Sequence, residues 1–185
     1  VTDRKQCGGE FLKTVQTLAG QGLKTIILRE KDLSEEEYGE LAARCMEICR
    51  KTGASLTLHK YFHAARGLGA DRIHLPYPVF RENAGKIDQH IHVSTSIHAP
   101  GEAVEAERMG AEFVIAGHIF QTDCKKGVPP RGLEFLRETV QSVSIPVYAI
   151  GGITPYNIGD VLDTGAAGGC MMSGCLLYTS PSPRD

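Results

Sequence analysis

One histidine and two lysines stand close together where an apolar run of this sequence ends. The segment GHIFQTDCKKG, residues 117–127, places His118 directly after a glycine and Lys125 a few residues further on. Imidazole accepts and donates protons near neutral pH because its unperturbed pKa is about 6.5, and an ammonium group stabilises negative charge. We therefore predict that His118 is a general acid/base and that Lys125 stabilises charge on a substrate. A histidine that only hydrogen-bonds a loop carbonyl, beside a solvated charged loop, is the alternative.

A second segment, GGITPYN at 151–157, has the composition of a phosphate cradle. Two glycines end an apolar run, Thr154 can cap a helix and Pro155 suits its first position. Backbone N–H groups at such a corner bind anions, although the glycines can also serve only to form the turn. The predicted phosphate-binding residues are Gly151, Gly152, Ser173 and Gly174.

Further polar groups follow other apolar runs. In LREKDL (28–33), Arg29 and Lys31 can hold an anionic substrate or form a solvated salt bridge. Ser96 and His98 follow a later run, and we assign them to substrate binding. Histidines 59, 98 and 118 share no zinc-ligand spacing and have no accompanying carboxylate, so we predict no metal site.

Short β-branched runs alternate with longer helical patterns, which indicates βα units and a parallel sheet. The clearest helix spans 34–53, where Ser34 can cap the first turn and Gly53 can end the helix. The predicted strands are 24–28, 54–58, 71–75, 90–94, 112–116, 146–150 and 168–172.

These seven strands, with Val1–Arg4 as the end of an eighth, predict a (β/α)8 TIM barrel that is truncated at both ends and lacks its final helix. A doubly wound open sheet is the alternative, but it expects a glycine-rich turn after the first strand. We predict one domain over 1–177, followed by a foreign or disordered tail at 178–185; a natural flexible tail is the other interpretation. Active groups of such barrels lie at the carboxyl ends of the strands.

Composition excludes several classes of partner. With 20 basic and 22 acidic residues among 185, the net charge of −2 gives no electrostatic basis for binding nucleic acid or a membrane surface. No apolar run has the length of a bilayer span, and no signal-peptide core is expected at the start. The six cysteines show no zinc spacing, and we expect a reduced, cytoplasmic protein.

From residue 1 to about 175, the sequence resembles the thiamine phosphate synthase/TenI family of barrels. The segments that carry the resemblance are TDR at the start, LREKDL, GGITPYN and the closing MMSG. The resemblance implies one of two activities. Synthases join an aminopyrimidine diphosphate to a thiazole phosphate using magnesium, whereas TenI-like tautomerases move protons on a carboxythiazole phosphate so that its ring becomes aromatic.

Several positions resemble the tautomerase branch. Synthases have an Asn-Asp pair where this sequence has His59-Lys60, a magnesium aspartate where it has Val79, and a proline where it has His118. GHIFQTDCKKG, TSIH and HLP are close to the tautomerase pattern. Arg29 and Lys31 match positions that hold diphosphate in synthases, and we interpret them as inherited residues that now contact the substrate carboxylate.

The resemblance therefore predicts a thiazole tautomerase. We expect it to act on a phosphorylated thiazole without a cofactor, and a homo-oligomer is compatible with this prediction. A magnesium-dependent thiamine phosphate synthase and a non-catalytic relative that binds phosphorylated thiazoles are the alternatives.

Overall fold

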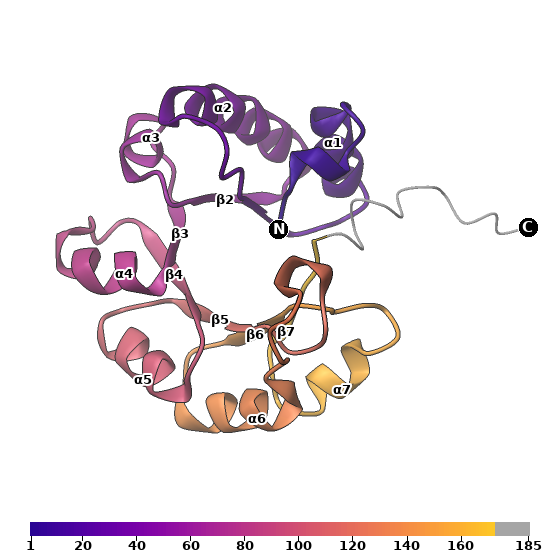
Figure 1. Cartoon of the computed structure of the whole chain (residues 1–185). Helices are drawn as coiled ribbons and strands as arrows, with labels where there is room; N and C mark the ends of the chain where they lie inside the picture. The colour runs from indigo at the N-terminus through magenta and orange to yellow at the C-terminus, as the bar shows by residue number, and fades with distance from the viewer. Residues whose placement is uncertain (173–185) are drawn as a thin grey trace, which may run out of the picture. The chain divides into compact units, whose positions relative to one another are not determined.

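The computed structural model describes residues 1–172, which divide into two compact units. The first unit comprises Val1–Ala70, and the second comprises Asp71–Met171. Both units are built from alternating strands and helices (Figure 1). The predicted phosphate ligands Ser173 and Gly174, and the predicted boundary between residues 177 and 178, lie outside the described residues.

The first unit contains two parallel strands, which pair from Thr25 with Ser55 to Leu28 with Leu58. Its predicted strands are confirmed to within one residue at each end. Its elements are η1 (Arg4–Gln6), α1 (Phe11–Gly20), β1 (Thr25–Leu28), α2 (Glu35–Thr52), β2 (Ser55–His59) and α3 (Phe62–Gly67). Residues 1–3 form no strand, but the Thr2 N–H donates to the Ile27 carbonyl at 2.9 Å, alongside β1.

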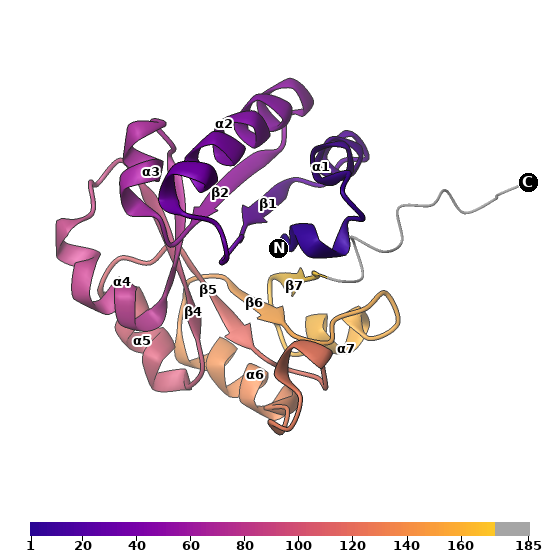
Figure 2. The ribbon, with the colours of Figure 1, turned by 45° about the horizontal axis from the view of Figure 1, so that its top comes forward.

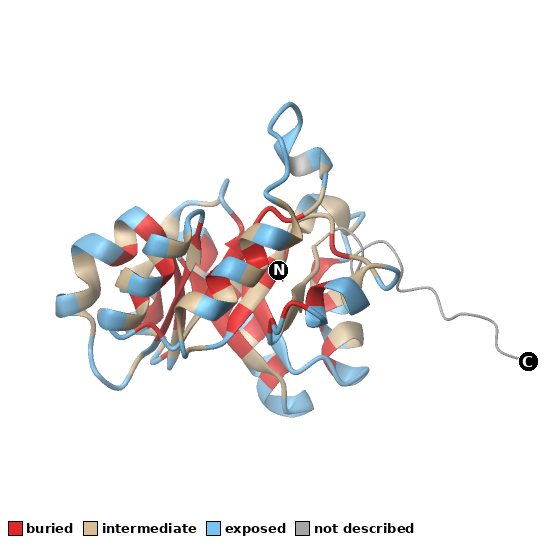
Figure 3. Cartoon of the chain, turned by 90° about the horizontal axis from the view of Figure 1, so that it is seen from below, coloured by how far each residue is buried: buried red, intermediate tan, exposed pale blue. Residues whose placement is uncertain are grey.

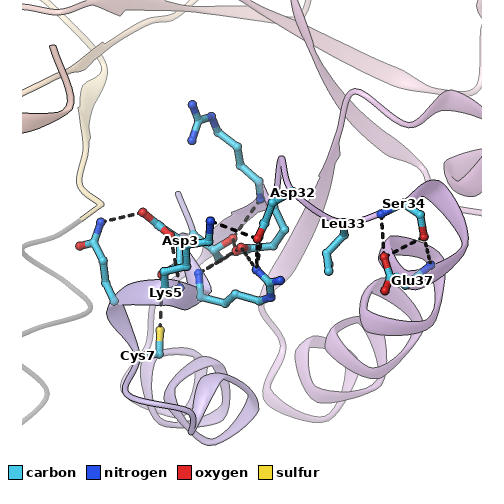
Figure 4. Close-up of polar contacts among 12 residues, drawn as sticks. Asp3, Lys5, Cys7, Asp32, Leu33, Ser34 and Glu37 are labelled. Carbon is cyan, nitrogen blue, oxygen red and sulfur yellow. Dashed lines mark hydrogen bonds and ion pairs between the residues drawn. The ribbon is translucent and has the colours of Figure 1, made fainter.

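Helix α2 begins and ends as its sequence predicts. The Ser34 hydroxyl accepts a hydrogen bond from the Glu37 N–H, and the Glu37 carboxylate accepts one from the Ser34 N–H, which forms a capping box (Figure 4). Gly53 ends the helix with a φ of 76°. The side chains that α2 buries recur at helical spacing: Tyr38, Ala42, Cys45 and Cys49.

Tyr38 connects this helix to the ends of both strands. Its side chain is fully buried, and its hydroxyl donates to the Leu28 carbonyl at 2.6 Å while accepting from the His59 N–H at 2.8 Å. Burial raises the pKa of Tyr38, so the phenol keeps the proton that it donates. One hydroxyl thus satisfies a buried acceptor at the end of β1 and a buried donor at the end of β2.

The second unit is a parallel sheet in the order β3-β4-β5-β6-β7. Its helices cover one face of the sheet (Figures 1 and 2), and buried residues are concentrated in most of the strands (Figure 3). The elements are β3 (Arg72–Pro76), α4 (Tyr77–Asn83), η2 (Ala84–Lys86), β4 (His92–Ile97), α5 (Pro100–Arg108), β5 (Phe113–Gly117), η3 (Asp123–Lys125), α6 (Gly132–Ser142), β6 (Val147–Ile150), α7 (Ile158–Leu162) and β7 (Gly168–Cys170).

Three local predictions for this unit differ from the structure. The strand predicted at 90–94 is β4 at His92–Ile97, because residues 88–91 form a turn in which the Asp88 carboxylate accepts from the His90 N–H. The last strand ends at Cys170, two residues earlier than predicted. Pro155 does not begin a helix, since α7 starts at Ile158.

The described residues contain no helix that is long and apolar enough to cross a membrane.

Replacing Tyr38 by Phe should lower the free energy of unfolding by about 1–3 kcal/mol, because the Leu28 carbonyl and the His59 N–H would both lose their buried partner. Urea denaturation measures the loss. Tyr61→Phe is the matched control, since among the described residues the Tyr61 hydroxyl makes one hydrogen bond, to the Leu33 carbonyl at 2.6 Å, and its loss should cost only about 0.5–1.5 kcal/mol. An equal or smaller loss for Tyr38→Phe would contradict the bridging role.

Candidate functional site

His118 directly follows β5 and is buried, with 7% of its surface exposed. Its Nε2 lies 3.3 Å from the Val128 carbonyl oxygen. A carbonyl only accepts, so this hydrogen bond places a proton on Nε2 and, in the neutral ring, leaves the lone pair on Nδ1. This contact to a loop carbonyl is the one expected if His118 has only a structural role. Proton transfer would use Nδ1, or Nε2 after release of Val128.

His98 lies beside the same segment. Its ring nitrogen Nδ1 is 2.8 Å from the Gly117 carbonyl oxygen, and its backbone N–H donates to the Glu102 carboxylate at 2.6 Å. Because the carbonyl accepts, Nδ1 carries the proton, and the Nε2 of the neutral ring can accept one. Arg131 also donates from Nε to the Gly117 carbonyl, at 3.1 Å. Sequence reasoning missed Arg131, which follows two prolines and stands in no recognisable motif.

Lys125 lies in η3, in the loop after His118, and its side chain is exposed. Among the described residues, no hydrogen bond or ion pair involves its ammonium group, whereas Lys126 lies 3.4 Å from the Asp123 carboxylate. The structure places Lys125 in the same loop as His118 but shows no contact between their side chains. Its predicted role in charge stabilisation stays a prediction.

Ser96 is the last but one residue of β4, and its hydroxyl lies 2.7 Å from Nε2 of His74. The other ring nitrogen, Nδ1, lies 2.8 Å from the Ser94 hydroxyl, and only 3% of His74 is exposed. A hydroxyl has one donor and two acceptor sites, so Ser96 retains capacity for a substrate. His74 is a buried titratable group for which the sequence provided no role.

The glycine pair at the end of β6 lies against the His118 segment. The Ile119 N–H donates to the Ile150 carbonyl at 2.9 Å, and the Phe120 N–H donates to the Gly151 carbonyl at 3.0 Å. A Cβ at Gly151 would lie 2.8 Å from Cα of His118, and one at Gly152 would lie 2.6 Å from the Gln121 carbonyl oxygen. Two segments that were singled out separately in the sequence are therefore neighbours, and the glycines allow their close approach.

The loop after these glycines is held by side chains and not by a long helix. The Thr154 N–H donates to the Asn157 side-chain oxygen at 2.8 Å, and the Asn157 amide donates to the Gly152 carbonyl at 2.9 Å. Thr154 accepts from the Tyr156 N–H at 3.3 Å, so it caps a turn. The five-residue α7 contributes little macrodipole, and phosphate binding at Gly151 and Gly152 rests on their backbone groups.

The first unit holds the other predicted ligands. Arg29 and Lys31 follow β1, and His59 and Lys60 lie at the end of β2. Burial of His59, followed by the positive charges of Arg29, Lys31 and Lys60, lowers its pKa to about 4. The charges of three nearby cations thus favour the neutral form of a buried imidazole. Sequence reasoning noted Lys60 only as a departure from the family pattern.

These side chains are a poor match for magnesium, a hard cation that prefers oxygen ligands. Cations repel it, and the second position where synthases have an aspartate is Val79, in the first turn of α4. Over residues 1–172, no group of three His, Cys, Asp or Glu side chains is arranged to hold a metal ion.

Replacing Gly152 by Ala should destabilise the protein by more than replacing Gly110 by Ala. Both glycines have positive φ, 66° and 89°, but a Cβ at Gly110 meets open space. The alanine at 152 should therefore cost the conformational strain of about 1 kcal/mol and, in addition, a displacement of the Gln121 carbonyl. Thermal unfolding of both variants measures the difference, and equal losses would mean that the contact to the 118–121 segment is not tight.

The depressed pKa of His59 has a consequence for stability. The unfolded chain protonates this residue near pH 6.5 and the folded chain only near pH 4. Its contribution is complete above pH 6.5 and is lost as the pH falls to 4. Wild-type protein should therefore lose more stability between pH 7 and pH 5 in urea denaturation than His59→Gln does. Parallel curves for the two proteins would show that His59 is not held neutral.

Comparison with known proteins identifies the family. The family model described as thiamine monophosphate synthase matches residues 1–175. The chain is 36% identical to "Putative thiamine-phosphate synthase 2" of Aquifex aeolicus, over 91% of each chain. It is also 36% identical to the thiamine-phosphate synthase of Syntrophomonas wolfei, over 94% of this chain and 85% of the relative.

A solved structure shares the fold as well. The chain is similar to the thiamine phosphate pyrophosphorylase of Pyrococcus furiosus, with a TM-score of 0.79 and 32% identity, over 93% of this chain and 83% of that one. This similarity confirms the predicted TIM-barrel class of α/β fold. The chain belongs to the thiamine monophosphate synthase family.

Proposed function

We propose that this member of the family is a thiazole tautomerase, an isomerase that converts a carboxythiazole phosphate to its aromatic tautomer. The observation that carries the proposal is the contact between the His118 segment and the Gly151–Gly152 corner. The proposed acid/base group and the proposed phosphate cradle are neighbours in one unit. A substrate whose phosphate occupies the corner would have its ring near imidazole.

The proposed chemistry needs one group that takes a proton and returns one. A proton leaves the ring carbon, and a proton arrives at the adjacent exocyclic carbon, so the composition and the charge of the substrate are unchanged overall. His118 is the proposed carrier, and Lys125 is proposed to stabilise the negative charge that builds between the two steps. The substrate's phosphate would be bound by Gly151 and Gly152, together with Ser173 and Gly174.

A thiamine phosphate synthase, which is a transferase, is the second candidate. The relatives favour it over the tautomerase, because the similar proteins of Aquifex aeolicus and Syntrophomonas wolfei are named putative thiamine-phosphate synthase 2 and thiamine-phosphate synthase. The side chains available as metal ligands argue against a synthase. The synthase reaction uses magnesium, and the described side chains around His59 and at Val79 do not suit that ion.

Two parallel incubations separate the candidates. Purified protein is given the carboxythiazole phosphate alone, and in parallel the aminopyrimidine diphosphate, thiazole phosphate and magnesium. We expect the aromatic tautomer in the first reaction and no thiamine phosphate at an enzymatic rate in the second. The reverse result would establish the transferase, and tight binding without proton exchange in heavy water would establish a non-catalytic relative.

His118→Asn should bind the product as wild type does and isomerise more slowly by about 10²–10⁴-fold, because asparagine hydrogen-bonds but does not shuttle protons. Steady-state turnover and product titration measure the two effects. His98→Asn is the matched variant, since His98 contacts the same segment through the Gly117 carbonyl. Near-wild-type turnover of His118→Asn, with a large loss for His98→Asn, would transfer the acid/base role to His98.

A further inference from the structure

Three cations gather where β1 and β2 end. We call Arg29, Lys31 and Lys60 the cation cluster. All three act electrostatically on the buried ring of His59, and no carboxylate is among the groups that shift its pKa. The imidazole at the centre adds no positive charge at neutral pH. The first unit therefore concentrates positive charge around a neutral hydrogen-bonding group.

The two carboxylates of the loop after β1 contact residues at the start of the chain. Glu30 is 3% exposed; its Oε1 accepts from the Thr2 hydroxyl at 2.6 Å, and both of its carboxylate oxygens accept from the Arg4 N–H, at 3.1 and 3.0 Å. Asp32 lies 2.9 Å from the Arg4 guanidinium and 3.2 Å from the Lys5 ammonium (Figure 4). Residues 2–5 at the start of the chain thus hold both acidic side chains of the REKD segment.

Lys60 is held in a conformation that a lysine rarely adopts. Its φ is 71°, and among the described residues it alone has a positive φ without being glycine. The Tyr61 N–H donates to the His59 carbonyl at 2.8 Å across it, which makes a tight three-residue turn. Its Nζ lies 5.2 Å from the centre of the Tyr61 ring. Such strain persists only where the surroundings enforce it, and it is frequent at binding sites.

The Tyr61 ring is itself fixed. Its hydroxyl donates to the Leu33 carbonyl at 2.6 Å, and its ring centre lies 4.7 Å from that of the buried Tyr38. The ammonium of Lys60 is therefore placed by a constrained backbone and by an anchored aromatic ring. A preorganised cation binds an anion without the cost of ordering a flexible side chain.

We propose that Lys60 supplies the positive charge that a divalent metal ion supplies in synthases, so that the cation cluster binds a multiply charged oxyanion without a metal ion. The ligand class is a diphosphate or a carboxylate-bearing phosphate. The inference rests on the proposed function only in taking the ligand to be a substrate group, and it concerns the first unit alone.

Calorimetric titration of the wild-type protein tests the proposal. The probes are inorganic pyrophosphate, for a phosphate oxyanion, and oxalate, for a carboxylate, each in EDTA and again with excess magnesium. We expect at least one probe to bind in EDTA, with no gain in affinity from magnesium. Binding that requires magnesium, or binding of neither probe, would overturn the proposal. Which probe binds more tightly identifies the chemical source of the oxyanion.

Three variants make the role of Lys60 specific. Lys60→Asn removes the charge, and asparagine tolerates positive φ, so the fold should persist; affinity in EDTA should fall about tenfold or more, the loss of one charge-assisted contact. Lys60→Asp should bind pyrophosphate only when magnesium is present. Lys24→Asn, at the amino end of β1, changes net charge equally and should bind as wild type does.

The outcomes remain distinct from those of the isomerase assay, because binding is measured without turnover. Far-ultraviolet circular dichroism and thermal unfolding verify that each variant is folded. Wild-type affinity in folded Lys60→Asn would refute the role of Lys60, whatever reaction the protein catalyses. Equal losses of affinity in Lys24→Asn and Lys60→Asn would show that only the net charge matters, and this result would also refute the role of Lys60.

Discussion

The hydroxyl of Tyr38 is the interaction on which the first unit depends. It joins the Leu28 carbonyl to the His59 N–H, and so it sets where β1 and β2 end relative to each other. Arg29 comes one residue after the first contact, and Lys60 comes one residue after the second. The spacing of two cations therefore depends on a buried, uncharged phenol. Packing of α2 determines the position of that phenol.

In the second unit, a close approach of two backbones has the comparable role. The residues after β5 hydrogen-bond to the Ile150 and Gly151 carbonyls, while the Gly117 carbonyl accepts from His98 and Arg131. The orientation of the His118 ring is thus the outcome of contacts from three loops. The histidines of the two units have different surroundings. In the first unit, nearby cations act on the buried His59, whereas in the second His98 and His118 hydrogen-bond to backbone carbonyls.

Periodicity and capping predicted most of the fold, because local patterns determine where strands and helices lie. Ser34 and Gly53 bound α2 as expected, and the seven strands predicted between residues 24 and 172 were each found within a few residues, whereas Val1–Arg4 form no strand. The helix expected at Pro155 failed because Asn157 ties the loop back to Gly152, a contact that spacing does not reveal. Arg29, His118 and Gly151 each directly follow a strand, as predicted. Arg131, the His74–Ser96 contact and the turn at Lys60 depend on tertiary neighbours that no local pattern encodes.

The glycines at 117, 151 and 152 have a consequence for how mutational data on this protein are interpreted. Each leaves no room for a methyl group beside a neighbouring segment. A saturation screen would find these positions intolerant to every substitution, with the profile usually ascribed to ligand contact. Here that intolerance would arise from backbone packing alone, whether or not a phosphate is bound. Sensitivity to substitution near His118 thus reports how closely the two loops pack. Measurements that depend on a bound ligand are needed to distinguish this packing from a role in binding or catalysis.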